Sequence, residues 1–261
     1  MKVLVTGPDG VLGSNLVREL ISRGHDVTAF TEAEKPSPTL ENLPIKMVSG
    51  NLLDRTTINE ITKGIDIVVH CAALTTVFPA RSAIVNKVNV DGTQYIVDAC
   101  LENKVQRLIF VGSANSFGPG KIAELGNETK PFIGAKYKLD YIESKFKAKN
   151  LVLDAVKNRG LDAIVVCPTF MIGPYDSKPS SGAMILGVYN KKIPGYTLGG
   201  KNYVAVKDVA VAIANGITTG KKGECYILGN DNLTYKAAVS YTHLRAHETK
   251  ANLVCRLLLE K

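Results

Sequence analysis

Apolar residues in the first two thirds of the chain gather in short runs, and amphipathic stretches separate those runs. The runs are almost wholly apolar, which is typical of strands in a parallel sheet covered on both faces. They predict strands at residues 2–6, 27–31, 45–49, 65–71, 108–111 and 163–167. The stretches between them predict helices at residues 14–23, 56–63, 85–103 and 137–159. This alternation predicts an α/β fold built on a doubly wound parallel sheet.

A glycine-rich turn joins the first predicted strand to the first predicted helix, with Gly7, Gly10 and Gly13 spaced three apart. In a dinucleotide site, one such glycine permits a tight turn, one lets the backbone approach a diphosphate, and one lets helix and strand pack closely. The helix N-terminus then offers N–H groups and a positive dipole end to the phosphates. An ordinary glycine turn is the alternative, but the order strand, turn, helix favours cofactor binding.

Tyr141 and Lys145 lie four residues apart in the stretch 137–159, which suits an amphipathic helix. Their side chains would share one face, with Cβ atoms roughly 6 Å apart. We expect the ammonium to lower the tyrosine pKa from its ordinary value of about 10, which suits proton exchange with a substrate oxygen. The same spacing recurs at Tyr203 and Lys207. There an alternating run indicates a strand, on which four residues span about 13 Å, so the helical pair is the better candidate.

Several motifs follow one another in a fixed order: Thr6-Gly7-x-x-Gly10-x-x-Gly13, Asn51-Leu52-Leu53-Asp54, His70-Cys71-Ala72-Ala73, Asn89-Val90-x-Gly92-Thr93, Val111-Gly112-Ser113-Ala114, Tyr141-x-x-x-Lys145 and Cys167-Pro168-Thr169. In these motifs the chain resembles an extended short-chain dehydrogenase/reductase, in the broad epimerase/dehydratase and dihydroflavonol-reductase-like group. The resemblance runs from residue 1 to about residue 238. It implies a Rossmann-type sheet followed by a small substrate-binding lobe.

The resemblance implies roles for individual residues. Tyr141 would donate or accept the proton at the substrate oxygen, Ser113 would hydrogen-bond the same oxygen, and Lys145 would tune Tyr141 and bind the nicotinamide ribose. Pro168 would fix the nicotinamide, and Asn51 would contact the adenine, where the family more often has aspartate. His70, at the end of an apolar run, is expected to be structural. The other expected cofactor contacts are Gly7, Gly10, Val11, Leu12, Gly13, Leu52, Ala72, Ala73 and Asn89.

The end of the second predicted strand bears on the choice of cofactor. Glu32 stands there, and a carboxylate at this place binds the ribose hydroxyls of NAD and repels the extra phosphate of NADP. Thr31 occupies the position at which many NAD-using epimerases have aspartate, and Lys35 is close enough to favour a phosphate. We expect NAD, with NADP as the alternative.

The chain divides into three parts by this interpretation. Residues 1–168 would form the dinucleotide-binding domain, and residues 169–238 a partial substrate-binding lobe interleaved with it. Residues 239–261 depart from the family pattern. The peptide Val-Ser-Tyr-Thr-His-Leu-Arg-Ala-His-Glu-Thr back-translates to a transposase-end sequencing adapter read in frame. We therefore expect a non-native tail that leaves the lobe truncated; a genuine amphipathic helix is the alternative.

Composition and charge limit the classes of partner that the protein is expected to bind. The chain has a formal net charge of +8, but its lysines are scattered without interleaved aromatic residues, which argues against a nucleic-acid partner. No apolar run is long enough to span a bilayer, and none resembles a signal sequence. The cysteines lie in apolar runs without metal-ligand spacing, which indicates reduced thiols, no metal site and a cytoplasmic protein. The helices predicted at residues 85–103 and 137–159 could pair two subunits.

These observations predict an NAD(P)-dependent oxidoreductase that interconverts a secondary alcohol and a carbonyl on a small organic substrate. Ile142 stands after the tyrosine, where sugar-nucleotide epimerases of the family commonly have glycine, so the resemblance favours the reductase branch. The segment from Gly173 to Leu186 is expected to form the substrate wall. A nucleotide-sugar epimerase or dehydratase with transient oxidation is one alternative, and a non-catalytic cofactor-binding protein is another.

Overall fold

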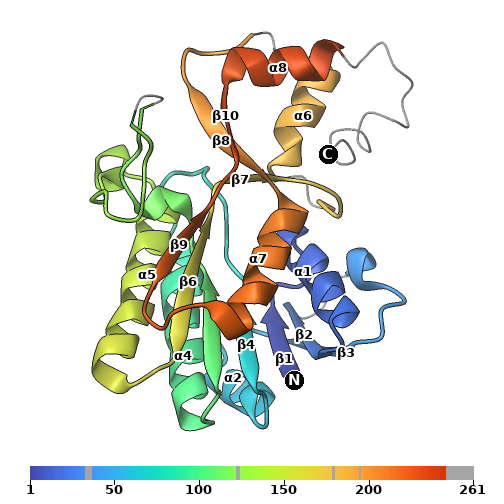
Figure 1. Ribbon diagram of the computed structural model, residues 1–261, viewed down its shortest axis with the longest axis vertical. Coiled ribbons are helices and arrows are strands. Elements are labelled where there is room, and N and C mark those ends of the chain that lie inside the picture. Colours follow the sequence, from blue (N-terminus) through green and yellow to red (C-terminus); the bar gives the residue numbers. More distant parts are fainter. Residues whose placement is uncertain (33–36, 122–123, 178–179, 194, 245–261) are drawn as a thin grey trace.

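A computed structural model describes residues 1–32, 37–121, 124–177, 180–193 and 195–244. Its main feature is a seven-stranded sheet in the order β3-β2-β1-β4-β5-β6-β9, in which every neighbouring pair is parallel (Figure 1). The strands are β1 (Lys2–Thr6), β2 (Asp26–Glu32), β3 (Lys46–Gly50), β4 (Ile67–His70), β5 (Arg107–Val111), β6 (Ala163–Pro168) and β9 (Cys225–Leu228). The strand order reverses between β1 and β4, as in a doubly wound fold, so the predicted fold class is confirmed.

Helices cover both faces of this sheet (Figure 1). One face carries α1 (Val11–Ser22) and α7 (Val206–Thr219). The other carries α2 (Arg55–Thr62), α4 (Gly92–Glu102) and α5 (Asp140–Arg159). Burial on both faces favours apolar residues along the central strands, which is why β1, β4, β5 and β6 are mostly apolar, whereas the outer strand β3 is partly exposed.

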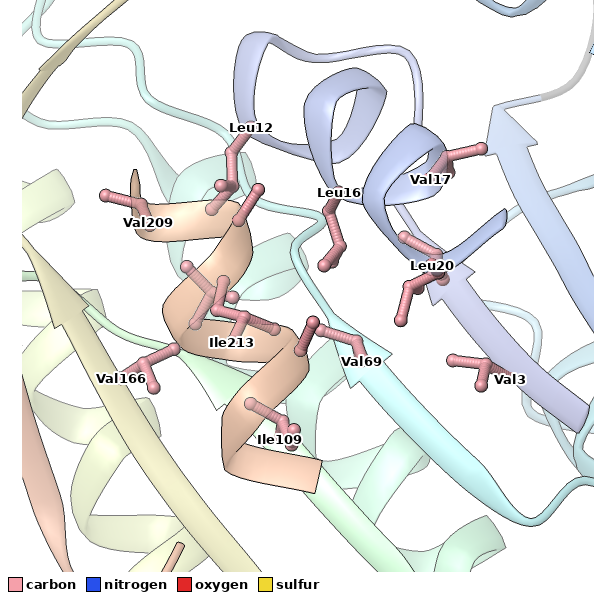
Figure 2. Packing of buried hydrophobic residues seen from close by; sticks show 14 of the residues in the cluster. Val3, Leu12, Leu16, Val17, Leu20, Val69, Ile109, Val166, Val209 and Ile213 are labelled. Atoms are coloured by element: carbon pink, nitrogen blue, oxygen red, sulfur yellow. The ribbon is translucent and has the colours of Figure 1, made fainter. Parts of the chain in front are cut away.

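The alternation of side chains along each strand divides the core into two clusters. Val3 and Val5 of β1 enter the cluster beneath α1 and α7, whereas Leu4 enters the cluster beneath α4 and α5. Figure 2 shows the first cluster, in which Leu16 of α1 and Ile213 of α7 point down onto the strands. Both of these side chains are fully buried.

A wider helical turn interrupts the helix predicted at residues 85–103. The chain forms α3 (Ala83–Asn86), then a π-helical turn (Lys87–Asp91), and then α4. Asn89 lies in the π-helical turn and is buried. Such turns often mark functional sites, because the extra residue redirects side chains toward a neighbouring element.

Two predicted boundaries are wrong. The helix expected from residue 137 begins only at Asp140, because Lys138 has a left-handed backbone (φ 50°) that closes a short 3-10 helix at Gly134–Tyr137. The strand expected to carry both Tyr203 and Lys207 ends at Ala205, and Lys207 lies in α7 instead.

A second, smaller sheet follows β6. Its order is β10-β8-β7, from β7 (Phe170–Ile172), β8 (Gly200–Ala205) and β10 (Asp231–Thr234). With α6 (Gly182–Tyr189) and α8 (Tyr235–Leu244) it forms a lobe above the carboxyl ends of the large sheet (Figure 1). Because α7 and β9 return to the large sheet between these elements, the lobe is interleaved with it. The predicted domain boundaries stay predictions. Residues 245–261, which make up most of the predicted tail at residues 239–261, lie outside the described part of the chain.

Short 3-10 helices complete the connections at Pro38–Leu40 and Ala114–Ser116. Among the residues described, no helix combines the length and the apolar character needed to cross a bilayer.

The buried face of α7 should carry much of the stability. Ile213 is fully buried, whereas Val211 on the same helix is 38% exposed. Replacing Ile213 with alanine should lower the free energy of unfolding by about 2–5 kcal/mol, because it removes buried apolar atoms and leaves a cavity. The matched change Val211→Ala should cost less than about 0.5 kcal/mol. Urea denaturation measures both, and equal losses would contradict this packing.

Candidate active site

The turn between β1 and α1 is held by close backbone contacts. Gly7 has φ 64°, and a Cβ there would lie 2.8 Å from the Ala72 backbone. A Cβ at Gly13 would lie 2.1 Å from the Gly7 carbonyl oxygen and 2.6 Å from Pro8 Cα. Any side chain at Gly13 would therefore push α1 away from β1. These two positions require glycine for the reasons that the sequence predicted.

Gly10 differs from the other two glycines because its outer side is open. A Cβ there would meet only the Gly7 carbonyl oxygen, at 3.7 Å. Gly10 is the N-cap of α1, so the N–H groups of Val11 and Leu12 lie in the first turn of the helix. An open backbone surface at a helix N-terminus fits a diphosphate, which binds to N–H groups and to the positive end of the helix dipole. The turn therefore fits a dinucleotide cofactor.

Other predicted contact residues follow the neighbouring strands at the same edge of the sheet. Glu32 is the exposed last residue of β2. Asn51 follows β3, and its side-chain oxygen accepts the Leu53 N–H at 2.9 Å. Leu52 packs against α4, where a Cβ at Gly92 would meet it at 2.8 Å. The carboxyl edge therefore collects the groups expected to surround the adenosine half of a dinucleotide.

His70 ends β4 and is the centre of a buried hydrogen-bond chain. The Thr93 hydroxyl donates to the Asn89 carbonyl at 2.7 Å, so His70 Nε2 donates to Thr93 Oγ1 at 3.1 Å. His70 Nδ1 then accepts from the Thr6 hydroxyl at 2.7 Å, and Thr6 Oγ1 accepts the Ala72 N–H at 3.2 Å. Burial lowers the pKa of His70 to about 3, so the ring is neutral near pH 7. This agrees with the expected structural role.

The side chain of Asn89 is also fully engaged. Its oxygen accepts the Leu74 N–H at 2.8 Å, and its amide donates to the Leu74 carbonyl at 2.9 Å and to Ser144 Oγ at 3.0 Å. The Ser144 hydroxyl in turn donates to the Tyr141 carbonyl at 2.9 Å. Asn89 therefore ties the loop after β4 to α5. Its predicted contact with the cofactor stays a prediction, and these bonds favour a supporting role.

The start of α5 is fastened by an acidic residue that the sequence analysis did not single out. Asp140 accepts from Arg81 Nη1 and from the Ser82 N–H, both at 2.6 Å. Glu143 adds a second ion pair to Arg81 at 3.0 Å. Acidic residues in a first helical turn are a signal that could have found this cap. The bonds hold the loop after β4 beside Tyr141.

The predicted catalytic residues come together beside the carboxyl end of β5. Ser113 caps a short 3-10 helix after this strand, and its side chain lies close enough to Tyr141 to affect the pKa of the phenol. Lys145 lies one turn after Tyr141 on α5 and is buried. Its ammonium donates to the Val111 carbonyl at 2.6 Å and lies 4.8 Å from the centre of the Phe110 ring.

The electrostatics differ from the expectation for the tyrosine. Burial raises the pKa of Tyr141 above its ordinary value, and the neighbouring Ser113 side chain opposes this rise. The expected net lowering of the Tyr141 pKa is therefore wrong for this arrangement, because burial of the phenol dominates. Burial lowers the pKa of Lys145 to about 8. Tyr141 is thus protonated at neutral pH, and Lys145 titrates within the physiological range.

Thiols border the site without reacting in it. Burial raises the pKa of Cys71 and of Cys167 to about 12, so both are protonated at neutral pH. Within the described ranges, the cysteines are free and no group of histidine, cysteine or acidic residues could hold a metal ion.

Pro168 is the last residue of β6 and pairs with Leu228 of β9. The next residue is fixed as well: the Thr169 N–H donates to the Leu228 carbonyl at 2.9 Å, and the Thr169 hydroxyl donates to Asn202 Oδ1 at 2.8 Å. The backbone after Pro168 is therefore held between the large sheet and the lobe.

Comparison with known proteins agrees with this architecture. A model of the NAD dependent epimerase/dehydratase family matches residues 3–229. The chain belongs to this family. It is 30% identical over 247 residues to the "Putative dihydroflavonol 4-reductase" of Synechocystis, which covers 91% of this chain and 70% of that protein. The members of the family are NAD-dependent enzymes.

Two solved structures superpose closely on this family member. The crystal structure of gox2253 has a TM-score of 0.88 and 32% sequence identity, over 94% of this chain and 74% of that one. The UDP-glucose 4-epimerase of Thermus thermophilus, in complex with NAD, has a TM-score of 0.82 and 23% identity, over 95% of this chain and 84% of that one. At 23% identity the second match shows the shared fold alone.

The glycine turn gives a test that separates folding from cofactor binding. Gly13→Ala should destabilise the protein, because its methyl group would overlap the Gly7 carbonyl. Gly10→Ala should fold normally yet weaken NADH binding by at least about tenfold, because its methyl group projects into the open space above the turn. Thermal unfolding and NADH fluorescence titration measure the two effects. Unchanged NADH affinity in Gly10→Ala would contradict a diphosphate at this turn.

Proposed function

We propose that the protein is an NAD-dependent oxidoreductase that interconverts a secondary alcohol and a carbonyl, with Ser113, Tyr141 and Lys145 at the reacting centre. The observation that carries this proposal is the proximity of the Ser113 and Tyr141 side chains at the carboxyl edge of the sheet. Two hydroxyls that meet there can both reach one substrate oxygen. Their position lies beyond β5, on the side of the sheet where dinucleotide-binding folds hold their ligands.

Each hydroxyl has a distinct part in carbonyl reduction. Tyr141, whose pKa is raised by burial, holds its proton at neutral pH and delivers it to the substrate oxygen. Ser113 donates a hydrogen bond to the same oxygen and stabilises the negative charge that develops there. The bound nicotinamide supplies the hydride. In alcohol oxidation Tyr141 takes the proton instead.

Lys145 supports this proton transfer with its charge. Its ammonium lies beside Val111, two residues before Ser113, in a buried environment where a charge acts strongly on its neighbours. A positive charge there stabilises the phenolate that Tyr141 becomes after it gives up its proton. We also assign to Lys145 the hydroxyls of the nicotinamide ribose.

The remaining residues would hold the cofactor. Gly7, Gly10 and Gly13 shape the turn for the diphosphate, and Val11 and Leu12 offer N–H groups to it. Glu32, exposed at the end of β2, favours NAD over NADP, because a carboxylate repels the additional phosphate. Asn51, Leu52, Ala72, Ala73 and Pro168 complete the expected set of contacts.

Alcohol and carbonyl interconversion is favoured over epimerisation by the apolar character of the lobe. Leu186 and Tyr189 are 46% and 43% exposed on α6. Such a surface suits an organic carbonyl compound better than a nucleotide sugar, and the Synechocystis relative bears a reductase name. A panel of carbonyl compounds with NADH separates the two functions. A net loss of NADH absorbance supports the oxidoreductase, whereas epimerisation leaves the absorbance unchanged.

Removal of the tyrosine hydroxyl tests the proposal directly. Tyr141→Phe should lower kcat for carbonyl reduction by at least about 100-fold, because the proton donor is lost. NADH affinity should stay within about twofold, which corresponds to roughly 0.4 kcal/mol. Tyr137→Phe is the matched control, since Tyr137 is 60% exposed three residues before α5 and should retain full activity. Comparable turnover in Tyr141→Phe and Tyr137→Phe would refute the assignment.

The pH dependence tests the role of Lys145. Carbonyl reduction needs both Tyr141 and Lys145 protonated, and the lower pKa, at about 8, belongs to Lys145. The value of kcat/KM for reduction should therefore be level below that pH and fall as the pH rises through it, since kcat/KM reports groups of the free enzyme. Lys145→Met should have a lower plateau and no fall near pH 8. Persistence of the same fall in Lys145→Met would assign it to another group.

A further inference from the structure

Arg18 lies in the second turn of α1 and connects three segments of the chain. Its Nη1 donates to the Ser14 carbonyl at 2.9 Å, within the helix. Its Nη2 donates to the Thr39 carbonyl at 2.7 Å, in the segment after β2. Its guanidinium carbon lies 3.7 Å from the centre of the Tyr175 ring, in the loop after β7. A planar guanidinium can bond at its edge and stack on its face at once, which a lysine cannot do.

The same helix contacts the cofactor turn. The Ser14 hydroxyl is close to the Pro8 carbonyl at 3.0 Å and to Thr39 Oγ1 at 2.8 Å. Thr39 Oγ1 in turn lies 3.5 Å from the Asp9 carbonyl. Pro8 and Asp9 belong to the glycine-rich turn itself. Thr39 therefore accepts a hydrogen bond from Arg18 and also contacts the turn that is expected to hold the diphosphate.

The backbone of the loop after β7 is restrained by contacts with two helices. Tyr175 has a left-handed backbone (φ 68°), which is strained for a residue with a Cβ. The Pro174 carbonyl accepts from Asn15 Nδ2 at 2.9 Å, and Asn15 is buried on α1. A Cβ at Gly173 would lie 2.2 Å from Val206 Cγ1, so the loop also rests on α7. Contacts with α1 and α7 therefore hold a strained backbone in place.

This loop in turn positions the lobe. Asp176 accepts the Ser180 N–H at 3.1 Å and the Gly182 N–H at 2.9 Å, and Gly182 begins α6. The line of contacts thus runs from Pro8 and Asp9, through α1, to the N-terminus of α6. The two ends of this line are the cofactor turn and the expected substrate wall.

We propose that Arg18 is a positioning residue that, with Tyr175 and Asn15, locks the substrate loop at residues 173–176 to the cofactor-binding helix α1. The proposal rests on the proposed function for its kinetic consequence and on the contacts alone for its structural one. Arg18 touches no reacting atom; it fixes the loop that carries α6. Loss of the stack should let this loop and α6 move, and so weaken substrate binding while the chemistry at Tyr141 proceeds.

Amide hydrogen exchange tests the structural part without any turnover. In Arg18→Met and in Tyr175→Leu, exchange in residues 173–176 and in α6 should quicken by roughly fivefold, the size expected for loss of one cation–π contact. Tyr175→Phe keeps the aromatic ring and should exchange like the wild type. Arg23→Met is the matched control, because Arg23 caps the same helix but pairs with Glu19 and Asn215.

Kinetics then test the functional part. Arg18→Met and Tyr175→Leu should raise KM for the carbonyl substrate roughly fivefold, with kcat and the NADH dissociation constant within about twofold. The double variant should be no worse than Arg18→Met, since Tyr175→Leu removes only the stack that Arg18→Met already removes. Tyr175→Leu leaves α1 unchanged, so its exchange rates and KM test the proposal if Arg18→Met proves unstable.

The outcomes separate the two proposals. A wild-type protein that binds no NADH and reduces no carbonyl would refute the proposed function, while faster exchange in Tyr175→Leu and not in Tyr175→Phe would still establish the lock. An active wild type in which neither Arg18→Met nor Tyr175→Leu alters exchange in the loop would overturn the lock and leave the proposed function standing.

Discussion

The contact of Gly13 with the backbone of Gly7 and Pro8 sets the position of α1, and most of the molecule follows from that position. A Cβ at Gly13 would overlap the Gly7 carbonyl oxygen, so only glycine lets the helix approach β1 this closely. At that separation Leu16 reaches the buried cluster shared with α7. The same placement directs the first turn of α1 toward the open space above Gly10, and it brings Asn15 and Arg18 to the loop after β7. One close approach therefore serves the core, the phosphate site and the substrate side together.

A chain of uncharged hydrogen bonds joins β1, α4 and α5 on the catalytic side of the site. The neutral ring of His70 joins Thr6 of β1 to Thr93 of α4, and Asn89 continues the connection to Ser144 of α5. A buried network whose members are all satisfied is rigid, because any displacement leaves a polar group without a partner. A protonated histidine would bring a second positive charge near Lys145. Burial keeps the ring neutral, so His70 adds no positive charge beside the ammonium of Lys145.

Several features could be predicted from the sequence because they are local. Apolar runs predicted six of the seven strands of the large sheet to within two residues, since burial on both faces favours apolar residues, but β9 was not predicted. The spacing of Gly7, Gly10 and Gly13 identified the turn, and the helical period brought Tyr141 and Lys145 onto one face of α5. The start of α5 was missed by three residues because the left-handed backbone of Lys138 has no strong signal in its residue type.

Other features depended on the packing of distant segments. The pKa of Tyr141 is raised because surrounding elements bury it, and the pair spacing alone pointed the other way. Lys145 bonds the Val111 carbonyl because β5 ends beside α5, a neighbour that the local sequence does not specify. The partners of Asp140 and of Arg18 are likewise set by loops far away in the chain. The sequence by itself determined the main strands and helices up to residue 168, the glycine turn and the candidate hydroxyls, because these depend on periodicity and on backbone sterics. Tertiary structure alone decided protonation states and side-chain partners, because desolvation and hydrogen bonding depend on what the folded chain brings alongside.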